Sequence, residues 1–493
     1  MNTWLFGWPP ETPRTSRKTY LQTSPYAGAA DFSCLASRCA NRSSIDHVSL
    51  ADLLRNAFVY PPHTIYRDVK NVATGFALPH GMEDELRFHF AYQSTSALSR
   101  PPSGAVSDEI LLNTYHQLLV RAVEQSTANM RNPWHLQSGG KDSTSLAIAL
   151  ADARPDTTCI TYLGGKEENE IESARFVANQ LGLRHEGLVC DPVRAYDRYL
   201  AMAPRMPLLT ADFATLSYAD LAAEISHQQG DGIIDGLGVD PYIGSPLHLK
   251  DHLLGLIARG VRMPGAWLKH PLVRRSFRLC FTLGTLQMNA FERHFPGSRF
   301  SDDEVDELLG WHVSSYSRKR MEAFQEDMQS ARSAEAVRRI VLVVLEAAGF
   351  AKGMYPAQAM GLKLAYPYCD RLLCDWIFND VPDDRLIGPR GESKVLMRRH
   401  IARHFDRLPY VKAKGSFRFD VQGLAKRRFE QVHAFALQAC ELLPGAPKWL
   451  EQHRHCLDNK FFASKFYLLA VTLPWLIAHL DDPTGGDAPS SPR

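Results

Sequence analysis

Short apolar runs and longer mixed segments alternate along the middle of this chain, and this pattern predicts its elements. The nearly continuous apolar run at residues 158–163 is typical of a buried strand, and residues 185–189 and 232–235 are predicted as two further strands. Residues 170–181 and 216–228 lie between them and are predicted as helices. Strands separated by helices of this length indicate an α/β fold with a parallel, doubly wound sheet.

The remaining segments divide the chain into three parts. The first part, residues 1–100, begins with a segment rich in Pro, Ser and Thr at 1–48, in which alternating pieces such as 31–37 predict hairpin strands. A short helix opened by Ser49 is predicted at 49–58. Residues 101–480 begin with a helical pattern from Val106 and are nearly all helical from about residue 247 onward. Residues 481–493 form a Pro/Gly/Ser tail that we expect to be disordered.

Composition supports a soluble enzyme without identifying it. A chain of 493 residues predicts two or more domains, and its formal charge of +2 gives no reason to expect nucleic acid or a membrane surface as partner. Its nine cysteines are scattered, so we expect reduced thiols and a cytoplasmic location. The apolar stretch 466–480 is interrupted by Pro474 and is not expected to span a bilayer.

The sequence S-G-G-K-D-S at residues 138–143 is the strongest single indication of chemistry. It follows a short apolar segment and precedes a longer one, which predicts a strand, a glycine turn and a helix. The start of the helix offers N–H groups to an anion, and we expect the hydroxyls of Ser138, Ser143 and Thr144 to face it too. Asp142 would place a carboxylate beside phosphates, which suits a bridging Mg²⁺ ion.

A second glycine-rich segment, D-G-L-G-V-D at residues 235–240, directly follows another predicted strand. Two glycines and an acid at a strand end predict a second close approach of the backbone to a ligand, with Asp240 sharing a metal with Asp142. A turn with a solvated aspartate is the alternative.

Three later segments, at residues 366–371, 391–399 and 412–417, carry further charged groups. A lysine in a glycine-marked loop can neutralise the charge that builds up on a pyrophosphate leaving group. Taken alone, Lys412 and Lys414 also fit ordinary surface charges.

The order of these segments resembles the asparagine synthetase family, which includes the β-lactam synthetases and lasso-peptide cyclases. Its synthetase domain carries S-G-G-x-D-S, a glycine-rich segment with an aspartate, P-F-L-D, G-x-x-K-x-x-L-R and a lysine shortly before G-F. The corresponding segments here are residues 138–143, 236–244, 367–370, 391–398 and 414–417. Residues 169–182 resemble the family's D-E-S-x-Y-A-R helix, and residues 53–78 resemble the end of its glutaminase domain.

This resemblance implies an ATP-pyrophosphatase type of sheet with a helical C-terminal extension, and a set of site residues. Lys414 is expected to be catalytic, and Asp142 and Asp240 are expected to hold Mg²⁺. The residues expected to bind ATP are Leu136, Ser138, Gly139, Gly140, Asp142, Ser143, Tyr162 and Gly236. The implied reaction adenylates a carboxylate, releases pyrophosphate and lets an amine displace AMP.

Two departures from the family pattern shape this expectation. The family's glutaminase uses an N-terminal cysteine, whereas Met1 is followed here by Asn2. Residues 1–100 match only the latter half of that domain, so we expect a truncated, inactive glutaminase-like domain and an amine carried by the substrate. Leu237 stands where asparagine synthetases have glutamate and β-lactam synthetases have tyrosine. The candidate bases Tyr242, Tyr355 and His63 stay open, as does loss of the proton to solvent or pyrophosphate.

The substrate is the least determined part. The predicted helical segment 247–341 is long and suggests macrolactam closure of a peptide, with a precursor-processing protease as the expected partner. It also holds a set of basic residues, which fit either a groove for a peptide or a solvated helical face: His248, Lys250, Arg259, Arg262, Lys269, Arg274, Arg275 and Arg278.

The alternatives are a β-lactam synthetase, an intermolecular or ammonia-dependent amide ligase acting on a sugar acid or secondary metabolite, and a tRNA-modifying ATP pyrophosphatase. The near-neutral charge disfavours the last.

Overall fold

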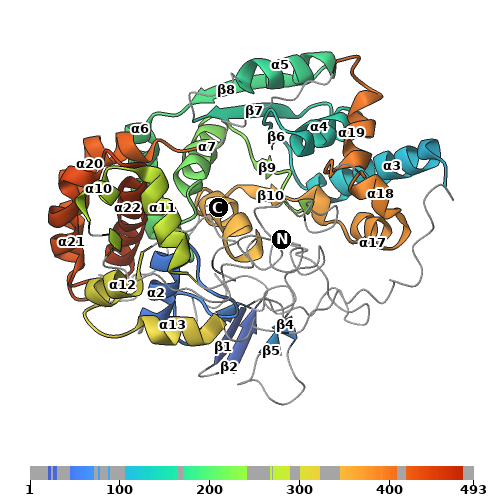
Figure 1. Cartoon of the computed structure of the whole chain (residues 1–493). Coiled ribbons are helices and arrows are strands. Elements are labelled where there is room, and N and C mark those ends of the chain that lie inside the picture. The colour runs from blue at the N-terminus through green and yellow to red at the C-terminus, as the bar shows by residue number, and fades with distance from the viewer. Residues whose placement is uncertain are drawn as a thin grey trace.

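A computed structural model of the chain shows a parallel sheet with helices packed around it (Figure 1). The part of the chain that it describes comprises residues 20–23, 26–29, 45–71, 76–77, 87–88, 106–164, 170–240, 267–268, 270–288, 292, 300–321, 345–389, 391–407 and 418–480. Two of our predictions, the hairpin piece 31–37 and the disordered tail 481–493, lie outside these residues.

The central sheet has five strands, and every neighbouring pair in it is parallel. In spatial order they are β10 (Lys363–Ala365), β9 (Gly232–Ile234), β6 (Pro133–Leu136), β7 (Thr158–Leu163) and β8 (Arg184–Val189). The chain starts in the middle at β6, adds β7 and β8 on one side, and then returns to add β9 and β10 on the other. The predicted doubly wound parallel sheet is confirmed, with its topological switch between β6 and β9.

Strand β10 corrects the prediction that the chain is nearly all helical after residue 247. It is three residues long and lies between two helices, η5–α16 (Leu345–Phe350, Ala351–Ala359) and α17 (Arg371–Asp380). A strand of this length has no readable period, so pairing with β9 decides its conformation.

Helices cover both faces of the sheet. Helix α3 (Asp108–Thr127) precedes β6, and the helices between the strands from β6 to β9 are α4 (Lys141–Ala153), α5 (Glu170–Gln180), α6 (Pro192–Met202), the short η1 (Ala203–Arg205) and α7 (Thr215–His227). The C-terminal helices are η6 (Pro367–Cys369), α17, α18 (Asp383–Leu386), α19 (Val395–Ala402), α20 (Val421–Gln438), α21 (Ala446–His453), η7 (Arg454–Cys456) and α22 (Lys460–Leu480).

The sheet separates two hydrophobic clusters because successive side chains of a strand point to opposite faces. Ile160 and Ile233 belong to the first cluster with α6, α7, α20 and α22, whereas Cys159 and Ile234 belong to the second with α3, α4 and α19. Burial on both faces explains why these strands are continuous apolar runs in the sequence.

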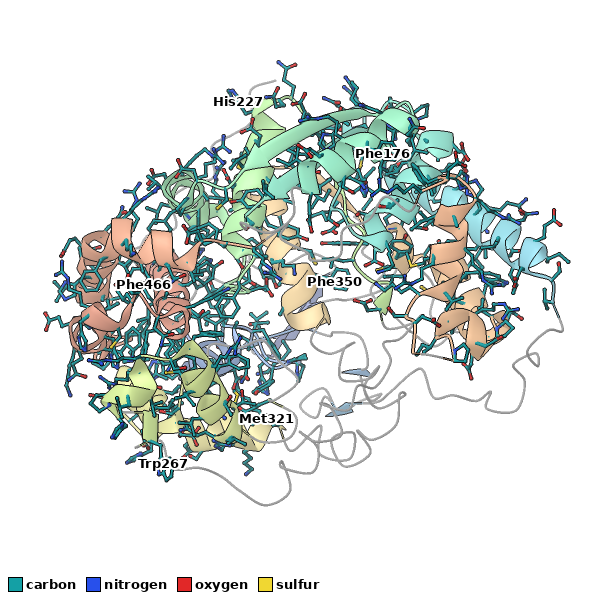
Figure 2. The ribbon with its side chains drawn as sticks, turned by 45° about the horizontal axis from the view of Figure 1, so that its top comes forward. Phe176, His227, Trp267, Met321, Phe350 and Phe466 are labelled. Carbon is teal, nitrogen blue, oxygen red and sulfur yellow. The ribbon has the colours of Figure 1, made fainter. Side chains whose placement is uncertain are left out.

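Helix α22 lies inside the first cluster. The window Lys460–His479 has a mean hydropathy of 1.6 and is long enough to cross a membrane, but 83% of it is buried inside the protein. Phe466, labelled in Figure 2, is fully buried in this helical layer. The composition of α22 is therefore that of a core helix, as the prediction for residues 466–480 requires.

The N-terminal part contributes antiparallel strands and one helix. A three-stranded sheet has the order β2-β1-β3 (Tyr26–Ala29, Tyr20–Thr23, Val69–Asn71), and β4 pairs with β5 (Phe76–Ala77, Arg87–Phe88). Helix α2 (His47–Asn56) starts two residues earlier than predicted, because Asp46 is its cap and accepts from Val48 N. Ser49, the predicted cap, instead donates its hydroxyl to Asp46. The glutaminase-like character of this part stays a prediction.

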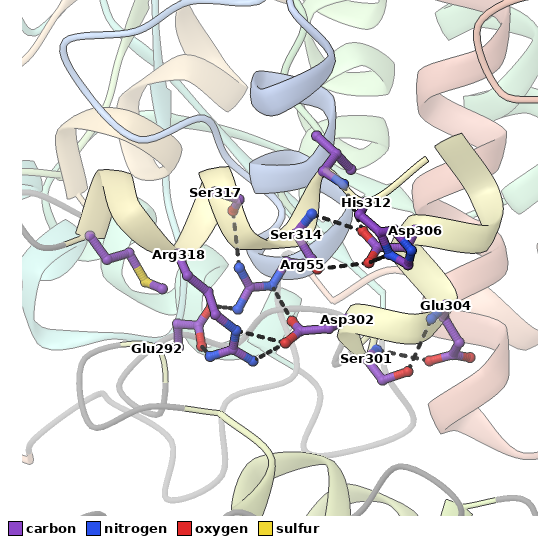
Figure 3. Close-up of polar contacts among 12 residues, drawn as sticks. Arg55, Glu292, Ser301, Asp302, Glu304, Asp306, His312, Ser314, Ser317 and Arg318 are labelled. Carbon is purple, nitrogen blue, oxygen red and sulfur yellow. Dashed lines mark hydrogen bonds and ion pairs between the residues drawn. The ribbon is translucent and has the colours of Figure 1, made fainter. Parts of the chain in front are cut away.

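A long excursion separates the adjacent strands β9 and β10. Besides η5 and α16, its described helices include α10 (Pro271–Arg274), α11 (Phe277–Leu286), α12 (Asp302–Leu309) and α13 (Ser314–Arg320), and α12 and α13 pack on α2. Buried charges join them: Arg55 of α2 pairs with Glu292, and its other guanidinium nitrogens contact Ser317 and Asp302 (Figure 3). Helices α12 and α13 are thus fixed to the N-terminal segment, whereas α16, at the end of the excursion, packs on α7 and β10.

We predict that Arg55→Met lowers the free energy of unfolding by about 3 kcal/mol, because it leaves the Glu292 carboxylate buried without its main partner. Both side chains are at most 2% exposed. Chemical denaturation followed by circular dichroism measures the loss. Lys448→Met is the matched control, since it breaks an ion pair with Glu307 whose side chains are 63% and 46% exposed, and it should cost less than about 1 kcal/mol. Equal losses in the two variants would contradict the assignment.

Candidate active site

Three of the predicted motifs follow three neighbouring strands. The glycine loop comes directly after β6, the segment 235–240 after β9, and the segment 366–371 after β10. In a parallel sheet these carboxyl ends share one edge, and the switch between β6 and β9 opens a crevice there. The topology therefore brings segments more than 200 residues apart in the sequence to one place.

The glycine loop is braced by its own hydroxyl groups. The Ser143 hydroxyl donates to Ser138 O at 2.9 Å and accepts from Ser138 N at 3.1 Å, while the Ser138 hydroxyl accepts from Gly140 N at 3.2 Å. The Thr144 hydroxyl donates to Gly140 O at 2.7 Å and is fully buried. Thr144 thus corrects our expectation that all three hydroxyls face an anion, because its hydroxyl holds the loop instead.

The start of α4 is the part of the loop that suits a phosphate. Its cap residue is Gly140, and no side chain caps this end of the helix. The backbone N–H groups of the first turn and the positive end of the helix dipole together form an anion site. On the other side, the backbone of Gly236 packs against the loop, since a Cβ there would be in ordinary van der Waals contact with Ser143 N, at 3.6 Å.

Lys394 joins the two predicted metal ligands. Its ammonium lies 2.6 Å from a carboxylate oxygen of Asp142 and 2.6 Å from one of Asp240. The Lys394 side chain is 12% exposed, and burial lowers its pKa while the two carboxylates raise it. The carboxylates prevail, so the pKa of Lys394 is well above its usual range and the ammonium stays charged.

Lys394 has a strained backbone conformation at the position from which its side chain contacts Asp142 and Asp240. Lys394 caps α19 with φ 62° and ψ 44°, the left-handed region that residues with a Cβ seldom adopt. Such conformations cost of order 1–3 kcal/mol and concentrate at functional sites. Lys394 is the lysine of the motif at residues 391–398, and no role was predicted for it from the sequence. The lysine of that motif was the signal that would have found it.

The residues at this edge fit a magnesium ion. Two carboxylates converge on one cation, and hard oxygen ligands are what Mg²⁺ prefers. Within the described residues no group of three or more His, Cys, Asp or Glu side chains is placed to hold a metal. The protein thus offers two carboxylates, and Mg²⁺ ordinarily completes such a set with water and phosphate oxygens.

The other predicted site residues divide into two groups. Leu136 and Tyr162 are at most 3% exposed and belong to the first hydrophobic cluster. The Tyr162 side chain is therefore part of the core, and burial raises its pKa far above the usual range. Lys414, the predicted catalytic residue, lies outside the described residues, as do Lys412 and Tyr242.

Two of the candidate bases are now less suitable. The His63 ring nitrogen contacts the Lys70 ammonium at 3.0 Å, and burial together with Arg320 and Lys70 lowers the pKa of His63 to about 2. A histidine with so low a pKa is a weak base. Tyr355 is 7% exposed and packs in the first cluster.

Among the basic residues of the excursion, Arg275 and Arg278 are exposed. This exposure agrees with the solvated-face interpretation. His248, Lys250, Arg259, Arg262 and Lys269 lie outside the described residues.

Comparison with known proteins adds one finding. Residues 114–438 match the family model described as Asparagine synthase, and this range contains the glycine loop, both aspartates and Lys394. A comparison with curated protein sequences found no match.

We predict that Lys394→Met destabilises the metal-free protein by about 1–3 kcal/mol, because Asp142 and Asp240 lose the cation between them. Millimolar Mg²⁺ restores a positive charge there, so it should raise the melting temperature of the variant more than that of the wild type. Thermal unfolding with and without Mg²⁺ measures the difference. Lys394→Arg keeps the charge and serves as the control. An identical effect of Mg²⁺ on wild type and Lys394→Met would contradict a shared cation site.

Proposed function

We propose that this chain, which belongs to the asparagine synthase family, closes an amide bond within a peptide substrate. Membership makes the chain an ATP-dependent C–N ligase, and the family uses ATP, typically with Mg²⁺. The substrate and the position of the amine are our proposal. Our proposal that this chain uses ATP rests on one observation, which is the convergence of Asp142, Asp240 and Lys394 at the glycine loop.

The first step activates a carboxylate. One carboxylate oxygen of the substrate attacks the α-phosphorus of ATP, the bond to the bridging oxygen of the β-phosphate breaks, and pyrophosphate leaves. The loop N–H groups and Lys394 are placed to stabilise the charge on that leaving group. Asp142 and Asp240 would hold the Mg²⁺ ion, which when bound neutralises phosphate charge.

The second step forms the amide. The substrate amine attacks the acyl carbon of the adenylate, the bond from that carbon to the phosphate oxygen breaks, and AMP leaves. Lys414 would stabilise the tetrahedral intermediate, and the amine proton passes to a base, to solvent or to pyrophosphate. The enzyme would accelerate this step by proximity, since ring closure requires the amine and the acyl carbon of the substrate to be held in a reactive geometry.

The peptide substrate is supported by the excursion between β9 and β10. It starts at the carboxyl end of β9, beside the site, and its described helices α12 and α13 are fixed to α2 by buried ion pairs. An excursion of this length between two neighbouring strands of the sheet suits a large substrate better than a small β-amino acid. A β-lactam synthetase and an intermolecular amide ligase are the other outcomes that a substrate screen would reveal.

We predict that the protein converts ATP into AMP and pyrophosphate in the presence of Mg²⁺ and a peptide bearing a free amine and a carboxylate. Asp142→Asn and Asp240→Asn should each lower this turnover by at least about 10²-fold, because each removes a metal ligand. Chromatography of the nucleotides measures it, and circular dichroism checks the fold. Asp375→Asn is the matched control, since Asp375 pairs with Arg371 on the exposed surface of α17. ADP and phosphate as products would overturn the proposal.

We further predict that Lys414→Ala binds ATP normally but forms amide about 10²–10³-fold more slowly, because it removes a group that acts on the transition state. Lys412→Ala, two residues away, is the control and should lose little activity. Single-turnover kinetics separate binding from chemistry. If Lys412→Ala abolishes amide formation while Lys414→Ala does not, the assignment within this loop is wrong.

A further inference from the structure

One stretch of the excursion between β9 and β10 is strongly basic. Residues 252–291 contain six Lys or Arg residues and no Asp or Glu, although the whole chain has nearly equal numbers of basic and acidic residues, 56 and 54. The overall charge of +2 therefore conceals this stretch. The structure describes two helices within it, α10 and α11.

The same stretch exposes large apolar side chains. Of the twelve large hydrophobic side chains that are exposed among the described residues, five lie between residues 267 and 281. Leu272 is 67% exposed, Trp267 54% and Leu279 50%, and the exposed rings of Phe277 and Phe281 stack with their centroids 5.7 Å apart. Single exposed apolar residues are ordinary, whereas a concentration of them marks a surface that binds a partner.

A firmly held backbone presents these side chains. Cys280, on the inner side of α11, is buried in the first hydrophobic cluster, and its thiol donates to Val273 O at 3.2 Å. Asn459, the residue before α22, donates its side-chain amide to Arg274 O at 2.7 Å, and α11 packs on α22. Because the helices are already ordered, binding through their outer residues does not require this segment to fold first.

Two arginines lie among the exposed apolar side chains. Arg275 and Arg278 are exposed, and neither forms an ion pair with a described residue. Asp458, which precedes Asn459, brings a carboxylate close to this surface, but that carboxylate lies 2.9 Å from the ammonium of Lys426. The surface thus combines apolar side chains with positive charge that is available to a partner.

The surface formed by α10 and α11 lies away from the candidate active site. In Figure 1 both helices stand beside α20, α21 and α22, on the opposite side of the view from α4 and α19, whose starts hold the glycine loop and Lys394. Trp267 lies at the outer edge of the molecule in Figure 2. A partner on this surface would therefore leave the proposed ATP site open.

An anionic lipid surface fits this combination better than a peptide does. Consecutive residues of an α-helix are about 100° apart around its axis, so Leu279 and Phe281 project from nearly opposite sides of α11. A peptide lying along one side of the helix would not cover both, whereas a helix that dips into the headgroup region has both covered at once. Trp, Phe and Leu side chains favour the boundary between headgroups and acyl chains, and arginine pairs with phosphate.

We propose that α10 and α11 form a docking surface for an anionic lipid bilayer. The side chains of Trp267, Leu272 and Leu279 insert below the headgroups, and Arg275 and Arg278 bind the headgroup phosphates. The attachment is peripheral and reversible, because only a few side chains insert. It requires neither ATP nor a peptide, so it is independent of the proposed function.

Sedimentation with lipid vesicles tests this surface directly. The protein is mixed with vesicles of phosphatidylcholine alone, or of phosphatidylcholine and phosphatidylserine in equal parts, and its partition into the pellet is measured against lipid concentration. We expect binding to the mixed vesicles and weaker binding to the neutral ones. High salt should remove the difference between them, since it screens the contribution of charge.

Substitutions at exposed positions separate the two contributions. Leu279→Ser should weaken partition into mixed vesicles about fivefold, because it removes an inserted apolar side chain. Arg275→Gln combined with Arg278→Gln should weaken it about 20-fold in low salt and little in high salt. The matched controls lie on α20, where Leu437 is 56% exposed and the Arg427 side chain 58%. Leu437→Ser and Arg427→Gln should bind vesicles like the wild type, and circular dichroism checks the fold of each variant.

The outcomes separate a lipid surface from other partners. Equal partition into neutral and mixed vesicles, or equal losses in Leu279→Ser and Leu437→Ser, would overturn the proposal. If vesicle binding is unchanged in Leu279→Ser while the KM for a peptide rises, or while self-association in sedimentation velocity is lost, the surface binds a peptide or a second copy instead. ATP turnover without vesicles should be the same in every variant, so this test stands whether or not the proposed function is correct.

Discussion

Two carboxylates that converge on one point repel each other unless a cation lies between them, and the site of this protein is organised by that constraint. Asp142 follows β6, Asp240 follows β9, and the Lys394 ammonium contacts both. Lys394 adopts a left-handed backbone conformation to reach them. The free energy that the two contacts supply must exceed the cost of that strain, because the conformation persists.

The sheet topology creates the constraint before any side chain is considered. The chain leaves β6 toward one side and later returns to its other side with β9, which makes the carboxyl ends of these two strands the switch point at which such sheets bind ligands. Lys394 comes from the helix α19, which packs on α4 in the second cluster. The C-terminal helices therefore do more than cover the sheet, since one of them supplies the cation.

The sequence predicted the parts of this arrangement that depend on local pattern. β7 has the predicted bounds of 158–163, because burial on both faces makes it a continuous apolar run. The glycine loop was recognisable because the motif S-G-G-K-D-S stands between a strand and a helix. β10 was missed because its pairing with β9, not its own pattern, makes it a strand. The role of Lys394 depends on its contacts with Asp142 and Asp240, and Asp142 is 252 residues away in the sequence. A local sequence pattern does not reveal contacts over such a separation.

The hydroxyls of the loop change how nucleotide recognition should be understood. Ser143 and Thr144 use their hydroxyls to hold the shape of the loop, so backbone N–H groups remain as the main donors to phosphate. Recognition by the backbone depends on loop geometry more than on side-chain identity, because an N–H group cannot be redirected by changing a rotamer. The hydroxyl of Tyr368 donates to the carbonyl of Asp142, so we expect contacts of this kind, which fix the backbone from behind, to affect the proposed ATP binding without touching the nucleotide.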